Sequence, residues 1–280
     1  MLDIVILAAG KGSRMKSSLP KVLHPIAGKP LLGHVIDTAR QISTQTLHII
    51  VGHGAEQVVS TIGADNLNTI TQTQQLGTAH AVQQALPYLN DNSITLILYG
   101  DVPLIGLDTL QRLVNSVDSN SLGLLTVTLE QPSGYGRIIR NEQQQVVAIV
   151  EQKDANQEQL AINEVNTGVM AINSKHLQQW LPALSNNNAQ GEYYLSDVIA
   201  LAEQQGVTIN TQQPQYEWEV LGVNDRRQQA QLERIFQHNT ADQLMQQGVT
   251  LADPARFDCR GELSVGNCLL YTSPSPRDRG

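Results

Sequence analysis

The first predicted strand of this chain runs straight into a glycine-rich loop. The strand spans Ile4–Ala8, and the loop that follows contains Gly10, Lys11 and Gly12. Because glycine has no side chain, several main-chain N–H groups can converge there on one anion. A β-branched strand followed by such a loop predicts a phosphate-binding cradle, and hence a nucleotide site, at the start of the chain.

The loop differs from two familiar phosphate-binding loops. It lacks the third glycine of the dinucleotide fingerprint, and Gly12-Ser13-Arg14 does not provide the Gly-Lys-Ser/Thr ending of a Walker loop. It does carry Arg14, which can fork onto phosphate oxygens, and Lys21, which offers a point charge. The alternative interpretation is a tight turn with two solvated surface cations.

The composition limits the kinds of protein that this chain can be. With 280 residues, 41% of them hydrophobic, it can bury an ordinary core as one large domain or one domain with appendages. A net charge of −8 is atypical of proteins that coat nucleic acid. The two cysteines, Cys259 and Cys268, cannot build a disulfide framework, and the apolar start ends in the glycine loop rather than at a cleavage site. We therefore expect a cytoplasmic protein without nucleic-acid or membrane partners.

Apolar runs of strand length alternate with amphipathic stretches through the first half of the chain. The stretches 31–39 and 55–62 repeat apolar residues at helical spacing. This alternation predicts an α/β fold, with a mostly parallel sheet flanked by helices and ligands at the carboxyl ends of its strands. The expected strands are Ile4–Ala8, Leu47–Val51, Thr69–Thr71, Ile94–Tyr99 and Leu122–Leu129.

Shorter pieces separated by turns follow from about residue 130. The runs Gln145–Glu151 and Val165–Ile172 are interpreted as antiparallel strands of a lid over the ligand edge of the sheet. A helix is expected over Ser196–Gln205, with Ser196 as its N-cap and Gly206 just past its end.

The last part of the chain changes character again. The polar segment Asp225–Gln247 has only a narrow apolar stripe and as a helix would reach about 34 Å. We interpret it as a connecting arm that Gly248 closes, rather than as a core helix. Residues 268–280 contain two Ser-Pro pairs and no periodicity, which predicts an unstructured tail.

A single carboxylate follows the strand that ends at Tyr99. Asp101 comes directly after Gly100 and is thereby placed at the ligand edge of a parallel sheet. Mg²⁺ prefers one or two carboxylates together with phosphate oxygens and water, so a lone aspartate suits a metal that a nucleotide carries. The alternative is that Asp101 serves as a turn or N-cap residue before Pro103.

Three polar loops are further candidates for ligand contacts. Gln72 opens the run to Ala79, and its amide can both donate and accept, as reading a pyrimidine edge requires. The runs Gly134–Arg137 and Asn163–Gly168 could supply polar contacts to a sugar, and the alternative for each loop is an ordinary turn.

The seven histidines have no metal-ligand spacing and are interpreted as structural or exposed.

Several of these runs together resemble the signature of sugar-1-phosphate nucleotidyltransferases. The resemblance begins with Leu7–Met15 and Pro20–Leu23. Further runs narrow it to the bacterial bifunctional N-acetylglucosamine-1-phosphate uridylyltransferases/glucosamine-1-phosphate acetyltransferases, over their uridylyltransferase half and linker arm, from Leu2 to Asn267. These further runs are Gln75–Thr78, Tyr99–Leu104, Gly134–Ile138, Asn186–Tyr194 and Asp253–Asp258.

The resemblance implies a Rossmann-like nucleotidyltransferase fold and a Mg²⁺-dependent reaction. UTP and N-acetylglucosamine 1-phosphate would give UDP-N-acetylglucosamine and pyrophosphate. Asp101 and Asn224 would bind the metal, Lys21 the phosphates and Arg14 the departing pyrophosphate, with Arg14, Lys21 and Asp101 as the catalytic residues. The implied contacts of the uridine end are Leu7, Ala8, Ala9, Gly10, Gln72, Gly77 and Thr78, and those of the sugar side are Tyr99, Gly100, Gly136, Glu151 and Asn166.

The same resemblance implies how the chain is divided. A nucleotidyltransferase domain would span 1–224, the arm 225–248 and the start of a left-handed β-helix 249–267, followed by the unstructured tail 268–280, which resembles no part of the family. In the family the β-helix performs acetyl transfer and forms the trimer. Because repeat folds need several stacked units, we expect this chain to lack acetyl transfer and the trimer.

Two other functions are left open. Another nucleotidyltransferase of the same fold would use dTTP, CTP or GTP, whereas a sugar-nucleotide sensor would keep the pocket and lose turnover. Gln72 favours uridine over other bases. A pure binder would not need the Asp101 and Asn224 pair together with the cations Arg14 and Lys21, which disfavours the sensor.

Overall fold

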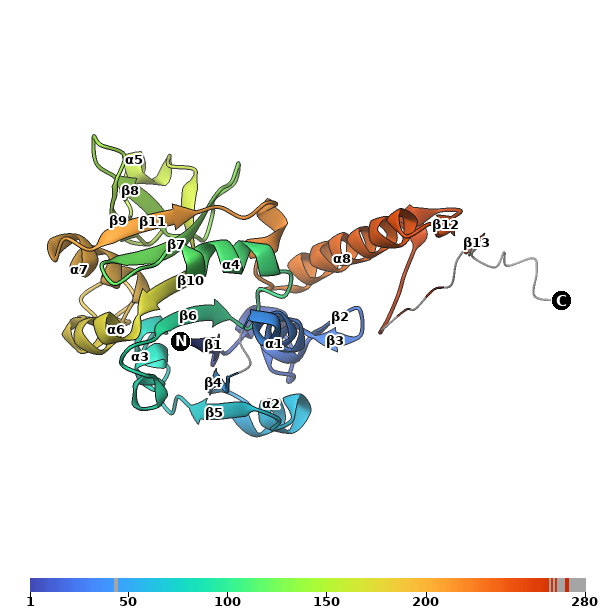
Figure 1. Cartoon of the computed structure of the whole chain (residues 1–280), viewed down its shortest axis with the longest axis horizontal. Helices are drawn as coiled ribbons and strands as arrows, with labels where there is room; N and C mark the ends of the chain where they lie inside the picture. The colour runs from blue at the N-terminus through green and yellow to red at the C-terminus, as the bar shows by residue number, and fades with distance from the viewer. Residues whose placement is uncertain (43–44, 262, 264, 266–269, 272–280) are drawn as a thin grey trace.

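A central sheet covered by helices on both sides makes the body of the molecule. The computed structural model describes residues 1–42, 45–261, 263, 265 and 270–271. One long helix, α8 (Arg226–Gln246), projects from the body toward the C-terminus (Figure 1).

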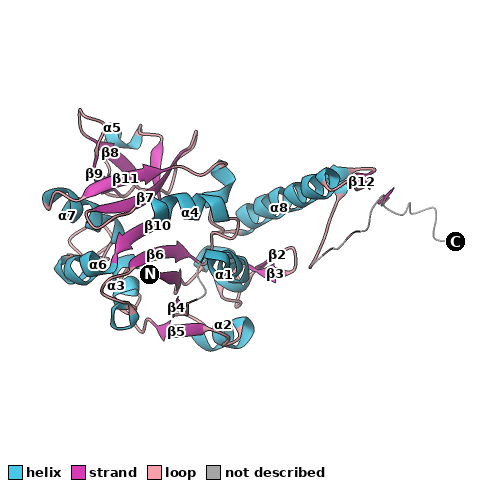
Figure 2. Ribbon diagram, viewed as in Figure 1, coloured by secondary structure: helices cyan, strands magenta, loops and turns pink. Residues whose placement is uncertain are grey.

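The main sheet is mixed, and its parallel half comes from the beginning of the chain (Figure 2). From edge to edge its strands are β11 (Thr208–Gln212), β7 (Ser121–Thr128), β10 (Glu164–Asn173), β6 (Ile94–Tyr99), β1 (Leu2–Ala8), β4 (Leu47–Val51) and β5 (Leu67–Thr71). β1 pairs in parallel with β4 and β6, and β4 pairs in parallel with β5. β10 joins this half antiparallel to β6, and a hairpin of β8 (Arg137–Arg140) and β9 (Val146–Val150) attaches to β10.

Six helices cover the two faces of the sheet. One face packs against α1 (Leu31–Ile42), α2 (Ala55–Ile62) and α4 (Leu107–Asn115), and the other against α3 (Thr78–Gln83), α6 (Ser174–Trp180) and α7 (Val198–Gln204).

β1 is buried because its residues alternate between the two cores. Ile4 and Ile6 belong to the core under α1, whereas Val5 and Leu7 belong to the core under α3. Successive side chains of a strand point to opposite faces, so an uninterrupted apolar run suits a strand with helices on both sides. This confirms the predicted α/β sheet.

Most of the predicted elements are confirmed with small shifts at their ends. The predicted strands 47–51 and 94–99 and the predicted helix 55–62 coincide with β4, β6 and α2. The predicted strand 69–71 begins two residues earlier, at Leu67.

The predicted lid over the ligand edge is wrong for Val165–Ile172. These residues lie in β10, between β6 and β7 in the main sheet, and Val165, Val169 and Ile172 are buried. The predicted antiparallel direction is confirmed, because β10 runs antiparallel to both β6 and β7. An apolar run of strand length suits a buried place in the main sheet as well as a place in a lid, so the run alone did not distinguish the two positions.

The predicted N-cap of the helix after residue 196 is also wrong. A 3₁₀ turn, Leu195–Asp197, precedes α7, and Asp197 occupies its N-cap position without a side-chain cap bond. The hydroxyl of Ser196 instead donates to Glu151 Oε1 at 2.9 Å. Gly206, which follows the helix, has a left-handed φ of +69°, as the prediction required.

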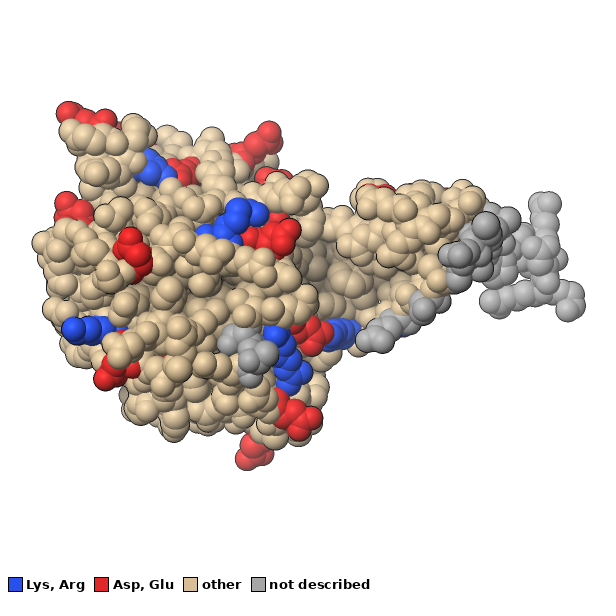
Figure 3. Space-filling view, in the orientation of Figure 1, with Lys and Arg blue, Asp and Glu red and all other residues tan. Residues whose placement is uncertain are grey.

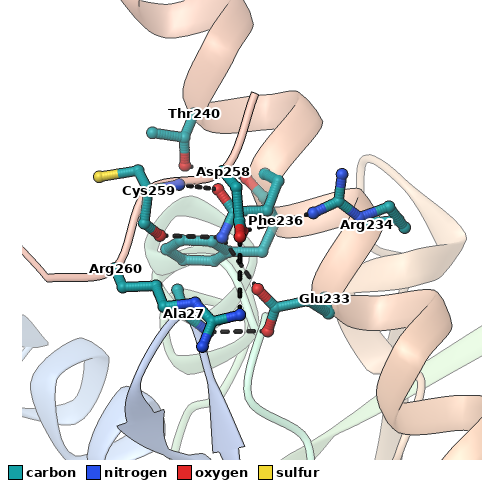
Figure 4. A network of polar contacts seen from close by, with 9 residues as sticks. Ala27, Glu233, Arg234, Phe236, Thr240, Asp258, Cys259 and Arg260 are labelled. Atoms are coloured by element: carbon teal, nitrogen blue, oxygen red, sulfur yellow. Dashed lines mark hydrogen bonds and ion pairs between the residues drawn. The ribbon is translucent and has the colours of Figure 1, made fainter. Parts of the chain in front are cut away.

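The first half of α8 is fastened to the segment that follows Lys21. Gln229 Nε2 donates to Pro25 O at 2.8 Å. Glu233 Oε2 accepts from Ala27 N at 2.8 Å, as Figure 4 shows. Pro25 and Ala27 belong to a small hairpin of β2 (Pro25–Ile26) and β3 (Lys29–Pro30). The helix thus braces a loop of the body.

The second half of α8 is covered by the chain that returns from its end. Gln237 is 1% exposed; its Nε2 donates to Cys259 O at 2.8 Å and its Oε1 accepts from Cys259 N at 2.7 Å. Asp258 pairs with Arg234 and Arg260 beside this contact (Figure 4). A buried amide bonded to both polar atoms of one residue holds the returning segment in register with the helix.

The segment expected to begin a β-helix is described only in part. It contains the short strand β12 (Thr250–Leu251). β12 pairs in parallel with β13 (Leu270–Tyr271), so the prediction that 268–280 is unstructured does not hold for these two apolar residues, which extend the edge of β12. The remaining residues of that predicted tail lie outside the described part of the chain.

Candidate active site

A cleft of about 510 Å³ opens at the carboxyl ends of β1, β5 and β6. The chain leaves β1 toward β4 and β5 on one side and returns to β6 on the other, so the order of strands reverses at β1. In open α/β sheets ligands bind in the crevice that such a reversal leaves. The residues that line the cleft of this chain are Leu7, Ala8, Ala9, Gly10, Lys11, Gly12, Ser13, Arg14, Lys21, Val22, Gln72, Gln75, Gly77, Thr78, Ala81, Tyr99, Asp101, Glu192 and Asn224.

Three polar side chains meet in this cleft. Lys21 Nζ donates to Asp101 Oδ2 and, at 3.2 Å, to Asn224 Oδ1. The side chains of Lys21 and Asp101 are only 14% and 16% exposed. Two oxygens from distant parts of the chain therefore converge on one positively charged atom.

Main-chain contacts hold Asn224 beside Asp101. Val223 N donates to Asp101 O at 2.9 Å, and Asn224 N donates to Gln228 Oε1 at 2.7 Å. The next residue, Asp225, caps α8 by accepting from the first backbone N–H groups of the helix. Asn224 is thus fixed between the end of β6 and the first turn of α8.

The glycine loop approaches Lys21 closely. Gly12 has a left-handed φ of +61°, and a Cβ atom there would lie 2.6 Å from Lys21 Cβ. Only glycine fits this position without moving the lysine. Lys11 and Arg14, on the same loop, are exposed at the cleft and form no ion pair with any residue that the structure describes. Their charges are available to an anionic ligand.

The loop after β5 is locked against the segment around residue 193. Tyr193 N donates to Leu76 O at 2.8 Å, and Thr78 Oγ1 accepts from Leu195 N at 2.9 Å. A Cβ atom on Gly77 would lie 2.4 Å from Tyr193 O, so this contact requires glycine. One wall of the cleft is therefore held by a segment more than 100 residues away in the chain.

Tyr99 also borders the cleft. A Cβ atom on Gly168 would lie 2.6 Å from the Tyr99 ring, so the backbone of β10 packs directly against this ring. Burial, with the charges of Glu151 and Asp101, raises the pKa of Tyr99 well above its ordinary range. The phenol therefore stays neutral and can both donate and accept.

A second polar group lies behind Tyr99. Asn166 N donates to Gly136 O at 2.8 Å, and Asn166 Oδ1 accepts from Gly168 N at 2.9 Å. Burial raises the pKa of Glu151, the hydrogen bond from Ser196 opposes this rise, and the charge of Asp154 adds to it. The hairpin of β8 and β9 thus brings a carboxyl group toward the ring of Tyr99.

The cleft gathers most of the residues predicted from the sequence. Gly100, Gly136, Glu151 and Asn166 do not line it and stay predictions. Gly100 lies behind the rim, where its N–H donates to Leu7 O at 2.9 Å. The lining residues that were not predicted as individual contacts are Lys11, Gly12, Ser13, Val22, Gln75, Ala81 and Glu192, although Lys11 and Gly12 belong to the predicted phosphate-binding loop. All of them except Ala81 lie inside the sequence runs that carried the resemblance, so membership of those runs was the available signal.

Charged side chains on the face shown in Figure 3 are scattered and mixed in sign, without a broad basic area. The described part of the chain contains no helix that is both long and apolar enough to cross a membrane.

Within the described residues, no cluster of three or more His, Cys, Asp and Glu side chains could hold a metal ion. A metal at Asp101 and Asn224 would therefore need further ligands from a bound molecule or water.

Known proteins with similar sequences match nearly the whole chain. The chain is 61% identical over 277 residues to the Bifunctional protein GlmU of Cellvibrio japonicus (strain Ueda107). This match covers 96% of this chain and 61% of that protein. It is 58% identical over 268 residues to the protein of the same name from Marinobacter nauticus, covering 96% of this chain and 59% of that protein. The chain thus spans about three fifths of the length of these relatives, which confirms the resemblance over that part.

A solved structure shares the fold. A UDP-glucose pyrophosphorylase complexed with UDP-glucose superposes with a TM-score of 0.69 at 16% identity, covering 84% of this chain and 98% of the other. The family model described as a MobA-like NTP transferase domain matches residues 4–247, which include every residue of the cleft. The chain therefore belongs to the family of MobA-like NTP transferase domains.

Proposed function

We propose that this chain transfers UMP from UTP to N-acetylglucosamine 1-phosphate and releases pyrophosphate, with Mg²⁺ as its metal. The observation that carries the proposal is the meeting of Lys21 with Asp101 and Asn224 in a cleft rimmed by the glycine loop. The similarity to the proteins named Bifunctional protein GlmU and the matched sequence runs support the choice of substrates.

The oxygen donors suit Mg²⁺. Mg²⁺ binds through one or two carboxylates together with phosphate oxygens and water. Asp101 Oδ2 and Asn224 Oδ1 already face one cation, the ammonium group of Lys21, so their oxygens are arranged for positive charge. Asp101 and Asn224 would hold the metal, and when bound it would neutralise charge on the phosphate oxygens.

The proposed reaction needs alignment and positive charge rather than a general base. The phosphate oxygen of the sugar phosphate is already ionised; it forms a bond to the α-phosphorus of UTP while the bond from that phosphorus to the bridging oxygen breaks. Lys21 and Arg14 would stabilise the charge that leaves with pyrophosphate. Tyr99 and the group around Glu151 would border the sugar.

Pyrophosphate release tests the proposal. Each of UTP, CTP, GTP and dTTP is offered with N-acetylglucosamine 1-phosphate, with and without Mg²⁺. We expect release with UTP and Mg²⁺, and a loss of about 100-fold or more in Asp101→Ala, but not in Asp65→Ala, an exposed aspartate outside the cleft. Release with another nucleotide alone, or tight binding of UDP-N-acetylglucosamine without release, would contradict the proposal.

A further inference from the structure

We infer that His80 is a positioning residue that holds the amide of Gln72 in one orientation, so that the cleft offers a hydrogen-bond acceptor to the base of the nucleotide. The inference rests on the proposed function and deepens it, because it names the base edge that the cleft reads. Gln72 was predicted as a base contact, whereas His80 was interpreted only as a structural or exposed histidine.

The carbonyl of Gly77 determines which end of the Gln72 amide points inward. Gln72 is 3% exposed, and its Nε2 lies 3.2 Å from Gly77 O and 2.9 Å from His80 Nδ1. A carbonyl oxygen can only accept, so the amide atom that faces it is the nitrogen. The same nitrogen then donates to His80 Nδ1, which places the ring proton of a neutral His80 on Nε2.

A weaker contact competes for the ring of His80. Gln84 Nε2 lies 3.3 Å from His80 Nε2 and donates to His80 O at 3.0 Å. A neutral imidazole accepts at one ring nitrogen only. The contact at Nδ1 is shorter and its partner Gln72 is buried, whereas Gln84 is half-buried and already bonded to a carbonyl. The pairing with Gln72 therefore determines the tautomer, because leaving a buried donor unpaired costs more than leaving an accessible one unpaired.

This arrangement uses both N–H groups of the Gln72 amide. Its Oε1 accepts no hydrogen bond from any residue in the described part of the chain, and Gln72 lines the cleft. A ligand therefore meets an acceptor at this side chain. Uracil offers the N3–H donor at its pairing edge, whereas N3 of cytosine carries a lone pair that would face Oε1 unfavourably. Thymine shares the N3–H, so the useful comparison is UTP against CTP.

The test compares kcat and KM for UTP and CTP in five variants, one of them a control. His80→Leu removes the acceptor at similar volume, and we expect KM for UTP to rise about 3- to 10-fold with kcat nearly unchanged, and the preference for UTP over CTP to fall. His80→Asn keeps an oxygen near the place of Nδ1 and should restore both values. In a Gln72→Leu background, His80→Leu should add nothing, because its effect passes through Gln72. His238→Leu on the exposed surface of α8 is the matched control.

Three results would overturn the inference. They are an unchanged UTP-to-CTP preference in His80→Leu, additive effects in the double variant, and a fall in kcat alone. Equilibrium binding of UTP and CTP, measured by calorimetry on the same variants, separates this inference from the proposed function. If the unsubstituted chain transfers no nucleotide, the proposed function fails, while the binding preference and its loss in His80→Leu still decide the role of His80.

Discussion

At the scale of single residues, Lys21 connects distant parts of the chain within the cleft. It contacts Asp101 and Asn224, which lie 80 and 203 positions away in the chain, and a Cβ atom on Gly12 would collide with its Cβ. An ammonium group that two side chains hold has little freedom to relax, and the proposed function would use its charge preorganised for a polyanion. The placement of this one atom depends on the whole fold.

Lys21→Ala is expected to lower kcat by about 100- to 1,000-fold, because a preorganised positive charge beside the phosphates is lost. Pyrophosphate release measures this effect, and a thermal melt checks that the variant folds. Lys175→Ala, at an exposed position on α6, is the matched control. A rate for Lys21→Ala that equals the control would remove Lys21 from the reaction.

Gly12→Ala is expected to destabilise the chain by about 1–3 kcal/mol, because alanine is strained at a φ of +61° and its Cβ would collide with Lys21. The free energy of unfolding in urea measures the loss. Gly10→Ala offers a comparison in the same loop, since a Cβ there meets nothing within 4 Å and its φ is not left-handed. Equal stability of the two variants would contradict the close packing of the loop on the lysine.

Sequence patterns could predict some of these residues and not others. Asp101 follows an apolar strand, so its place at the ligand edge could be read from the pattern. Asn224 precedes a polar helix and has no such pattern; only the resemblance indicated it. The contact of His80 with Gln72 needs the turn at Gly77 to bring the two together, and spacing in the sequence does not show a turn's geometry.

At the scale of elements, burial on both faces made the parallel strands predictable. β1, β4 and β6 are continuous apolar runs that end at small or polar residues. β10 carries a similar apolar run, but whether a run joins the sheet or a lid depends on contacts with distant strands. Its assignment to a lid was therefore wrong, whereas the strand itself was correctly predicted.

The contact between β9 and the turn before α7 predicts a pH dependence. Burial raises the pKa of Glu151, so the folded chain keeps a proton there at pH values where the unfolded chain has lost it. The stability from this group is full below about pH 4 and is lost as pH rises through the raised pKa. Glu151→Gln has no charge to bury, so its stability relative to the unsubstituted chain should increase from pH 4 to pH 8.

Urea unfolding at pH 4, 6 and 8 measures this difference. Glu142→Gln, at an exposed position, reports what the loss of a surface carboxylate does by itself. A stability difference for Glu151→Gln that stays constant over this range, or that shrinks as pH rises, would contradict the conclusion that burial raises the pKa of Glu151.

The brace between α8 and the β2–β3 hairpin predicts a loss of stability on Glu233→Ala. The change removes the carboxylate that accepts hydrogen bonds from the N–H of the buried Ala27 and from Nε2 of Gln237. We expect a decrease of about 1–3 kcal/mol in the free energy of unfolding. Glu203→Ala, at an exposed position at the end of α7, should change it by less than about 0.5 kcal/mol. Similar values for both variants would mean that the brace adds nothing.

At the scale of the whole molecule, the cleft is assembled from both ends of the body. The glycine loop follows the first strand, and Asn224 stands just before the helix that leaves the body. A chain with a net charge of −8 concentrates Lys11, Arg14 and Lys21 around one cleft, which is the arrangement that a triphosphate needs. The fold class was predictable because it depends on hydrophobic periodicity, while the closeness of these distant segments required the structure.

The central claim is that this cleft joins UMP to a sugar phosphate. Phosphorus NMR on one mixture of UTP, N-acetylglucosamine 1-phosphate, Mg²⁺ and the chain tests it most directly. The account predicts that signals of UDP-N-acetylglucosamine and pyrophosphate grow together in equal amounts, and that neither appears with Asp101→Ala. Hydrolysis of UTP without formation of the sugar nucleotide, or unchanged spectra with the unsubstituted chain, would contradict it.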